Sequence, residues 1–393
     1  MRSFRFITKI FLASALLSLS GAGYSFAANE IDGTAASSQS YQGVPSQNVQ
    51  RQNSFGVFAP KPQTLNTRFD YSVWDAALED SVVQFGPSLR RPARRPRARL
   101  GSRIIKRTDR SPYRLEGSRV TFHSFSDRYE SALNLYKEDL VRLANVHDIQ
   151  AFNRNEQLAF WINLHNVVLI DAISQKHPTS YPSKQVFGLQ DELLHDAKLI
   201  TIKNIPLSLR DIREKIVYQN WKDPNVIYGF FRGDIGGPGI MHFAVTRENV
   251  KEVLFRNGLE YATSLRGFQT SNGARNVSII YHEARPYFFP NWSQDLETHL
   301  ATFAKGQDRL LSQVQQNKPF GLIKYETLIA DLWGGNRRVG SSTVTDLRGN
   351  IDPPPVLIER FEKLQELSVK GLLNRRHRVR IIDEAVGDNP IVE

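Results

Sequence analysis

Apolar and polar residues form several patterns along the chain, and the most apolar stretch is residues 155–171. Its apolar side chains would face every side of an α-helix, so this helix is expected to lie inside a domain. Polar residues interrupt the pattern at Glu156, Asn163, His165 and Asn166. Inside a domain these residues need partners, because an unpaired buried polar group costs about 1–3 kcal/mol.

Glu156, Asn163 and Asn166 would form one polar seam on this helix, since residues three or seven positions apart lie close together around the axis. Such a seam either holds neighbouring backbone or lines a site. Glu156 could be a buried general acid with a raised pKa or the partner of an arginine, and we favour the ion pair. The candidate partners are Arg154, Arg210 and Arg232.

The rest of the chain mixes helix and strand patterns without regular alternation. Further helices are predicted at 69–83, 129–144, 208–217, 246–264, 294–304, 309–316 and 355–373, with Ser126 as a capping residue. Strands are predicted at 119–125, 199–202, 226–231, 277–281 and 320–325. This mixture indicates an α+β fold, with a single core of short strands and packed helices.

The predicted core spans residues 65–335 and includes a basic loop at 88–118. Residues 1–27 have the basic start, short apolar run and small-residue cleavage site of a secretory signal peptide. Residues 28–64 are a polar leader, and 336–393 a connector with a C-terminal helical tail. No apolar run is long enough for a transmembrane segment in the mature chain. We therefore expect a periplasmic or secreted protein; an uncleaved anchor is the alternative.

The chain contains no cysteine. Disulfides, thiolate metal sites and a cysteine nucleophile are therefore excluded. His282-Glu283 lacks the second histidine of a zinc helix, and no G-x-S-x-G motif is present. We expect neither a metal site nor a cofactor.

The formal net charge of +11 is concentrated in one segment. Residues 90–119 hold twelve Lys or Arg against Asp109 and Glu116, a net charge of +10. Such a segment suits an anionic envelope polymer or lipid surface, whereas a solvated loop without a partner is the alternative. Nucleic acid is not favoured, because only Tyr113 offers a ring for stacking. The candidate contacts are Arg90, Arg91, Arg94 and Arg95.

A glycine-rich segment, residues 229–240 (GFFRGDIGGPGI), follows a predicted strand. Glycines allow close backbone approach, so this glycine loop could present N–H groups to an anion, although a tight turn after a core strand is the favoured interpretation. The candidate binding residues are Gly233, Gly236 and Gly237, together with Asn163 and Asn166 of the apolar helix. If acid–base chemistry occurs, the candidate groups are His165, His242 and Glu156.

Residues 156–166 (EQLAFWINLHN) resemble the signature E-Q-x-A-F-W-I-N-L-Y-N of DUF547, a family of unknown function, with His165 in the tyrosine position. Residues 207–212 (LSLRDI) and 223–226 (DPNV) are similar to its S-L-D-D-I and D-P-R-I segments. The resemblance covers the predicted core and identifies the chain as a cysteine-free member.

The glycine loop resembles the family segment C-G-x-x-S-C-P-P-L when Pro238 is placed on the first proline. Gly236 and Gly237 then take the places of the serine and the cysteine. A mechanism that uses that cysteine as a nucleophile cannot apply to this chain.

Two classes of function remain open. The first is a non-catalytic binding or scaffolding protein of the cell envelope, which the missing thiol and the basic segment favour. The alternative is an envelope hydrolase or transferase that uses His/Glu acid–base chemistry near the glycine loop. An enzyme requires these groups to meet in one cleft. The sequence indicates neither the ligand nor the oligomeric state.

Overall fold

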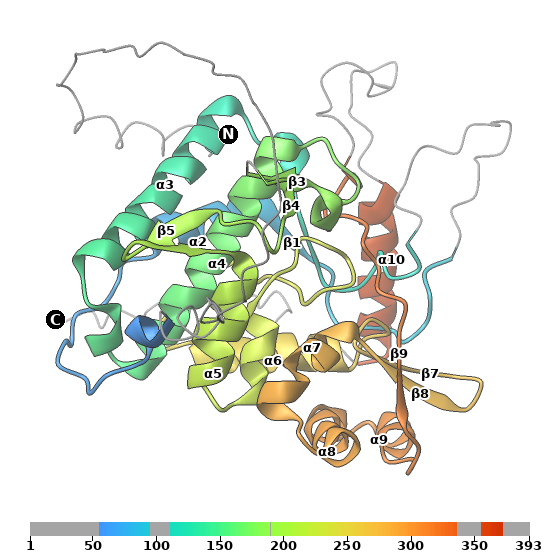
Figure 1. The fold of residues 1–393 in the computed structure, drawn as a ribbon. Helices are drawn as coiled ribbons and strands as arrows, with labels where there is room; N and C mark the ends of the chain where they lie inside the picture. The colour runs from blue at the N-terminus through green and yellow to red at the C-terminus, as the bar shows by residue number, and fades with distance from the viewer. Residues whose placement is uncertain (1–54, 95–110, 189, 336–354, 372–393) are drawn as a thin grey trace, which may run out of the picture. The chain divides into compact units, whose positions relative to one another are not determined.

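Helix α4 (Arg154–Lys176) runs through the centre of the structure, and its side chains from Glu156 to Ser174 are all buried (Figure 1). It is the apolar helix that the sequence predicts. Its N-cap is Asn153, whose side chain accepts a hydrogen bond from the Asn155 backbone N–H at 2.9 Å. A buried helix of this kind organises the core, because every neighbouring element can pack against it.

The computed structural model describes residues 55–94, 111–188, 190–335 and 355–371. The predicted signal peptide, most of the leader, the middle of the basic loop, and most of the connector and terminal tail lie outside these residues. All described residues belong to one unit of the chain, 48–393. In this part of the chain, no helix has the length and apolar character needed to cross a bilayer.

Helices surround α4 and supply most of the fold. They are α2 (Ser72–Ser81), α3 (Asp127–Val146), α5 (Tyr218–Asn220), α6 (Val250–Ala262), α7 (Ile279–Phe288), α8 (Trp292–Ala304), α9 (Asp308–Val314) and α10 (Pro355–Val369). A π-helical turn, η6 (Asp211–Val217), leads into α5. Ser126 caps α3 as predicted, since its hydroxyl accepts from the Tyr129 N–H at 3.2 Å. The other predicted helices are confirmed within a few residues.

The strands are short and form small separate sheets. They are β1 (Val82–Gln84), β2 (Ser118–Val120), β3 (Val186–Phe187), β4 (Glu192–Leu193), β5 (Ile200–Ile202), β6 (Ile205–Leu207), β7 (Phe268–Ser271), β8 (Ala274–Val277) and β9 (Phe320–Leu322). The pairs β1–β2, β3–β4 and β5–β6 are antiparallel. The sheet β7–β8–β9 has an antiparallel pair and a parallel one. The α+β prediction is therefore confirmed.

Three strand predictions are wrong in whole or in part. Residues 226–229 belong to a 3₁₀ helix, η7 (Pro224–Gly229), because Asp223 caps it and Pro224 starts it, and residues 230–231 follow this helix outside any strand. The predicted strand at 277–281 ends at Val277, where Ser278 caps α7. The strand predicted at 119–125 turns into a 3₁₀ helix at Phe122–Ser124. A short buried apolar run does not distinguish helix from strand.

An aromatic cluster joins η7 to α6, α7 and α8. The ring of Tyr228 stacks on His299 with centroids 5.7 Å apart. Tyr228 Oη lies 2.8 Å from His299 Nε2 and 3.1 Å from Tyr281 Oη. Burial lowers the pKa of His299 from 6.5 to about 4, so this histidine is neutral in the folded protein near neutral pH.

Candidate functional site

The polar seam of α4 holds the backbone of two segments that flank the glycine loop. Asn163 donates to Val245 O at 2.6 Å and accepts from Val245 N at 3.2 Å. Asn166 donates to Gly229 O and accepts from Phe231 N, both at 3.1 Å. Both amides are buried and engaged at each end, so these contacts align the glycine loop with α4.

His165 is fully buried, and both its ring nitrogens have partners. Nδ1 lies 3.1 Å from Asn166 Oδ1, and Nε2 lies 3.0 Å from Arg213 Nη1. A guanidinium can only donate, so Nε2 accepts and Nδ1 carries the proton. Burial, with the nearby Arg213 charge, holds the pKa of His165 well below 6.5. His165 is therefore a neutral link between α4 and η6.

Glu156 accepts a hydrogen bond from the Phe69 N–H at 3.2 Å. The predicted ion pair is wrong, because the candidate arginines bind elsewhere. Arg154 donates to Asn220 O, Arg210 pairs with Asp196, and Arg232 pairs with Glu283. Burial raises the pKa of Glu156, and the Phe69 N–H opposes the rise.

The three acid–base candidates do not meet in one pocket. Glu156 lines a pocket of about 390 Å³ together with Arg68, Asp75 and Arg247. His165 is enclosed in the core. His242 is exposed and lies edge-on to Phe243, with ring centroids 5.1 Å apart. The structure places these groups in three different surroundings.

The N–H groups of the glycine loop bind protein carbonyls. Ile235 N donates to Leu328 O at 2.7 Å, Gly236 N to Glu326 O at 2.9 Å, and Gly237 N to Asp234 O at 3.2 Å. A Cβ at Gly236 would lie 2.7 Å from Glu326 O, which explains the need for glycine there. The N–H groups of Gly236 and Gly237, two of the predicted anion-binding positions, are thus already engaged.

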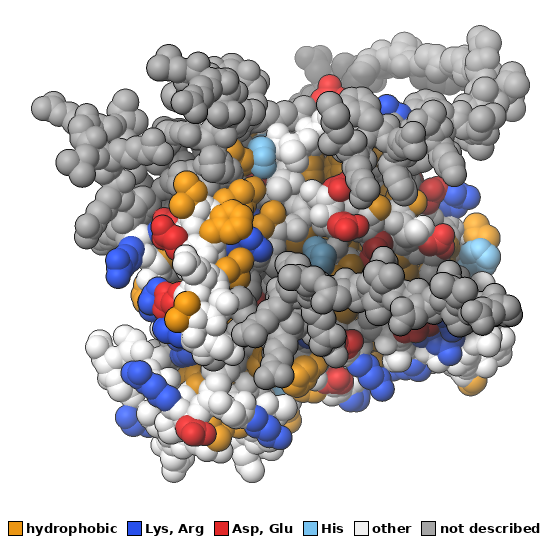
Figure 2. Space-filling view, turned by 180° about the vertical axis from the view of Figure 1, so that it is seen from behind, with side chains coloured by type: hydrophobic (Ala, Val, Ile, Leu, Met, Phe, Trp, Pro, Cys, Tyr) orange, Lys and Arg blue, Asp and Glu red, His pale blue; other side chains and the backbone are white. Residues whose placement is uncertain are grey.

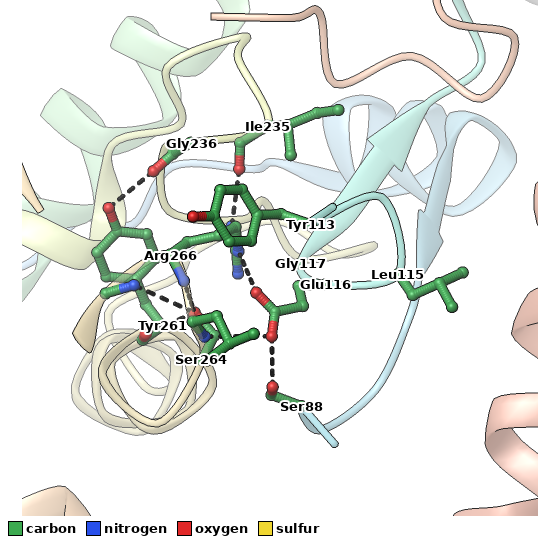
Figure 3. Close-up of polar contacts among 12 residues, drawn as sticks. Ser88, Tyr113, Leu115, Glu116, Gly117, Ile235, Gly236, Tyr261, Ser264 and Arg266 are labelled. Carbon is green, nitrogen blue, oxygen red and sulfur yellow. Dashed lines mark hydrogen bonds and ion pairs between the residues drawn. The ribbon is translucent and has the colours of Figure 1, made fainter. Parts of the chain in front are cut away.

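Arg266 holds the carbonyl side of the same loop, as Figure 3 shows. Its Nη1 donates to Ile235 O at 3.2 Å and to Gly237 O at 2.5 Å. Glu260 binds the guanidinium at 2.5 and 2.6 Å. Burial alone would lower the pKa of Arg266, but the Glu260 and Glu116 carboxylates outweigh it and the pKa is raised. The loop is therefore held on both sides by the fold.

Gly237, the position matched to the family cysteine, has no room for a side chain. A Cβ there would lie 2.7 Å from Arg232 Cβ and 2.8 Å from Arg232 Cγ. Arg232 is held by an ion pair with Glu283 at 2.7 Å. The arginine therefore occupies the space that a residue at 237 would enter.

A pocket of about 360 Å³ opens beside Arg232, and we call it the Arg232 pocket. Its polar lining consists of Ser183, His195, Arg210, Arg232, Asp234, Glu283, Tyr325 and Thr327. Its apolar lining comes from Ile279 and Ile280 of α7 and from Leu322 and Ile323 at the end of β9. Among the predicted site residues none lines this pocket.

Burial and charge shift the titration of the groups around this pocket. Burial raises the pKa of Asp234 well above 3.8 and, with Arg213, lowers that of His195 well below 6.5. Arg213 is fully buried, and burial together with Arg232 lowers its pKa to about 9. Burial opposes ionisation of Glu283, but Arg232 and Arg213 lower its pKa overall. The pocket therefore combines the Arg232–Glu283 ion pair with two groups, His195 and Asp234, whose uncharged forms are favoured by burial.

The sequence does contain a signal for this pocket. Arg232 directly follows the apolar run at 226–231, and Asp234 comes two residues later. Charged residues next to a buried run are rarely buried unless they are paired, so these two positions indicate that polar partners lie nearby. Glu283 and Tyr325 lie far away in the sequence, so only the fold shows that they belong to the same pocket.

The basic segment is partly built into the fold. Arg90 donates to Thr263 O at 2.8 Å and to Phe268 O at 3.2 Å. Arg91 binds Glu366 of α10, with Nη1 and Oε1 at 2.9 Å. Arg94 is exposed, whereas Arg95 lies outside the described residues. Arg90 and Arg91 thus have intramolecular roles, which leaves Arg94 as the described candidate for an external contact.

Helix α10 adds further contacts to this segment. Arg114 is 2 % exposed and binds Glu359 at 2.7 and 3.0 Å. Lys363 donates to Leu115 O at 2.5 Å. On the face shown in Figure 2, acidic and basic side chains of the described residues are interspersed. The charge of the segment is therefore partly neutralised within the protein.

Comparison with known families gives one result. Residues 149–261 match the model of the family described as "Protein of unknown function, DUF547". The resemblance seen in the signature helix is thereby confirmed over this segment, which contains α4, η6, the glycine loop and most of α6. Comparisons with curated proteins and with solved structures found no match. In the described part of the chain, no group of three or more His, Asp or Glu residues is arranged to hold a metal ion.

Proposed function

We propose that this chain is an exported, non-catalytic binding protein of the cell envelope and that the Arg232 pocket is its ligand site. The observation that carries the proposal is the position of Arg232, whose side chain fills the space beside Gly237. Gly237 stands where the resemblance places the family cysteine, and the space beside it is filled by Arg232, a charged group that can bind. The neighbouring pocket is within the size range of small-molecule sites and combines apolar with a few polar residues.

The alternative, an envelope hydrolase or transferase, needs His165, His242 or Glu156 to meet at the glycine loop. His165 is enclosed and hydrogen-bonded at both nitrogens, and His242 is exposed on another segment. A general base must reach its substrate directly or through one water molecule. This arrangement favours binding over acid–base catalysis.

Binding is tested by native mass spectrometry of the purified protein after incubation with a periplasmic small-molecule extract. We expect a retained ligand that is recovered chemically unchanged. Leu322 lines the pocket and is 48 % exposed, so Leu322→Trp should block the pocket without disturbing the core. Equal retention by this variant, or conversion of the ligand to a product, would contradict the proposal.

Export is supported by the signal-like pattern of residues 1–27. N-terminal sequencing of the protein from its native cells should begin at Ala28. Replacing apolar residues of the predicted signal with charged ones should leave the protein in the cytoplasm. A full-length N-terminus on the exported protein would instead indicate an uncleaved anchor.

A contact with an anionic envelope polymer or lipid surface is also part of the proposal. Its support is the composition of residues 90–119, because Arg94 is exposed and seven further Lys or Arg residues lie within 95–110. Such attraction weakens as salt increases. It would place the pocket near the surface that carries its ligand.

A further inference from the structure

The inner end of the Arg232 pocket has more hydrogen-bond donors than acceptors. Arg232 Nε, Arg213 Nε, Arg213 Nη2 and Tyr218 Oη have no partner among the described residues. The three side chains are only 5 %, 0 % and 1 % exposed. Buried donors without acceptors cost about 1–3 kcal/mol each, which is a reason to expect an acceptor from a ligand.

These residues belong to one neighbourhood. Arg232 lines the pocket directly. Arg213 lies behind His195, another lining residue, with Arg213 Nη1 3.5 Å from His195 Nδ1. The charges of Arg213 and Arg232 act on each other and on Tyr218, so the three side chains that carry these donors lie near one another.

The buried charges in this region do not balance. Arg213 and Arg232 contribute two positive charges, and the Glu283 carboxylate pairs with Arg232. Arg213 forms no ion pair with a carboxylate in the described residues, because its Nη1 contacts are the neutral rings of His165 and His195. A buried charge needs compensation, so the pair of guanidinium groups favours an additional anion.

Asp234 is a further buried polar group at the pocket. Its side chain lines the pocket, is 2 % exposed and has an unpartnered Oδ1. Burial favours the protonated form of this group, in which it can donate a hydrogen bond to an oxyanion. Arg210, at the same pocket, forms ion pairs with both the Asp196 and the Glu214 carboxylates and is 41 % exposed, so solvent screens it.

The rest of the lining is apolar. Ile279 and Ile280 of α7 and Leu322 and Ile323 near β9 provide branched aliphatic side chains. An inorganic ion would leave this surface unused. A ligand that combines an anionic group with a hydrocarbon part uses both kinds of lining.

We infer that the Arg232 pocket binds a small organic acid, with its carboxylate at Arg232 and its hydrocarbon part against Ile279, Ile280, Leu322 and Ile323. This inference rests on the proposed function, which assigns binding to the same pocket. The positive charge of Arg213, which lies next to His195, helps to compensate the negative charge of the bound carboxylate. Bidentate or multiple N–H contacts are the usual means by which arginine recognises a carboxylate.

The test is isothermal titration of the purified full-length protein at constant ionic strength, with hexanoate, hexylammonium and inorganic phosphate as probes. Hexanoate should bind saturably, whereas hexylammonium, of the same length and opposite charge, should bind about tenfold more weakly or not at all. Phosphate has no hydrocarbon part and should also bind more weakly. Stronger binding of hexylammonium or phosphate than of hexanoate would overturn the inference.

Arg213→Met tests the compensating charge. It removes a buried charge that has no carboxylate partner, so the variant should remain folded, and hexanoate affinity should fall about tenfold. The matched control is Arg154→Met, because Arg154 contacts Asn220 and Trp221 and does not line the pocket. Hexanoate affinity should be the same in this control as in the unaltered protein.

Leu322→Asp provides a second variant at a partly exposed lining position, where loss of folding is not expected. Its added carboxylate should weaken hexanoate binding about tenfold and should not weaken hexylammonium binding. Unchanged hexanoate affinity in both Arg213→Met and Leu322→Asp would overturn the inference. Retention of a neutral or cationic extract ligand in the native mass spectrum would overturn it too, while leaving the proposed binding function intact.

Discussion

The Arg232 side chain lies where a side chain at position 237 would begin, since a Cβ on Gly237 would be 2.7 Å from Arg232 Cβ. The position of Arg232 therefore explains why residue 237 has no side chain. An unhindered Cβ essentially never approaches a neighbour so closely, and the obstacle is the stem of the arginine rather than its flexible end. The replacement of the family cysteine by glycine and the placement of Arg232 are parts of the same local packing.

Restoring a side chain at this position should therefore destabilise the protein. We expect Gly237→Cys and Gly237→Ala to lower the free energy of unfolding by about 1–3 kcal/mol, because Arg232 must move away from Glu283 or the loop must shift. Urea denaturation measures the change. Gly56→Ala is the control, since a Cβ there meets nothing within 4 Å and the change should be within about 0.5 kcal/mol. Equal urea-denaturation midpoints for all three variants would contradict the close packing of Arg232 against position 237.

The polar seam of α4 should contribute to stability through the backbone that it holds. Asn163→Leu keeps a similar volume but leaves both the Val245 N–H and the Val245 carbonyl without their partner. We expect the free energy of unfolding to fall by about 2–4 kcal/mol. Replacing the exposed Gln219 with Ala should change it by less than about 0.5 kcal/mol. A small effect at Asn163 would argue that the seam has a role other than holding the loop.

Mild acid should destabilise the fold through its buried histidines. The folded pKa of His299 is about 4, whereas the unfolded chain binds a proton near pH 6.5. As the pH falls, the unfolded state therefore binds a proton before the folded state does. The stability that neutral His299 contributes is present above pH 6.5 and is lost as the pH falls toward 4. The loss should be about 1.4 kcal/mol per pH unit for each such histidine.

Urea denaturation between pH 7.5 and 5 measures this slope. His165 and His195 change in the same direction, because their pKa values are also lowered. In His299→Gln the free energy of unfolding should change less with pH, by the contribution of one histidine. This difference is expected whatever the variant's stability at pH 7.5. An unchanged slope would show that His299 binds its proton equally well in the folded and unfolded states, which contradicts a lowered pKa.

Arg90 and Arg94 should behave differently although they are close in the sequence. Arg90→Ser should lower the free energy of unfolding by about 1–3 kcal/mol, because Thr263 O and Phe268 O lose a charged donor. Arg94→Ser should leave stability unchanged and weaken binding to anionic vesicles in a salt-dependent manner. Denaturation and vesicle sedimentation measure the two effects. Vesicle binding that is equally strong with Arg94→Ser and insensitive to salt would rule out the electrostatic contact.

The sequence predicted the apolar helix well, because a long buried helix with caps has a strong and local pattern. The Ser126 cap and the α2 helix were predicted for the same reason. The run at 226–231 was assigned to the wrong element, since its apolar residues are equally compatible with a buried 3₁₀ helix. The prediction that this run is buried was correct, but its backbone conformation depends on Asp223 and Pro224.

The Arg232 pocket could not be assembled from the sequence. Its residues come from the glycine loop, from α7 and from the segment after β9, and long-range contacts of this kind leave no local pattern. The prediction that the glycine loop presents free N–H groups failed for a related reason. The carbonyls that engage the N–H groups of Ile235 and Gly236 belong to Leu328 and Glu326, about ninety positions away. Arg90 likewise binds carbonyls of residues 263 and 268.

Arg232 lies within residues 149–261, which match the family model, whereas its ion-pair partner Glu283 lies outside them. A fragment cut to the matched segment would retain Arg232 and lose Glu283, the carboxylate that pairs with it. Removing one partner of a buried pair costs about 3–5 kcal/mol, which is a large share of the stability of an ordinary domain. A stable fragment must therefore extend beyond residue 283, well past the segment that the family comparison matches.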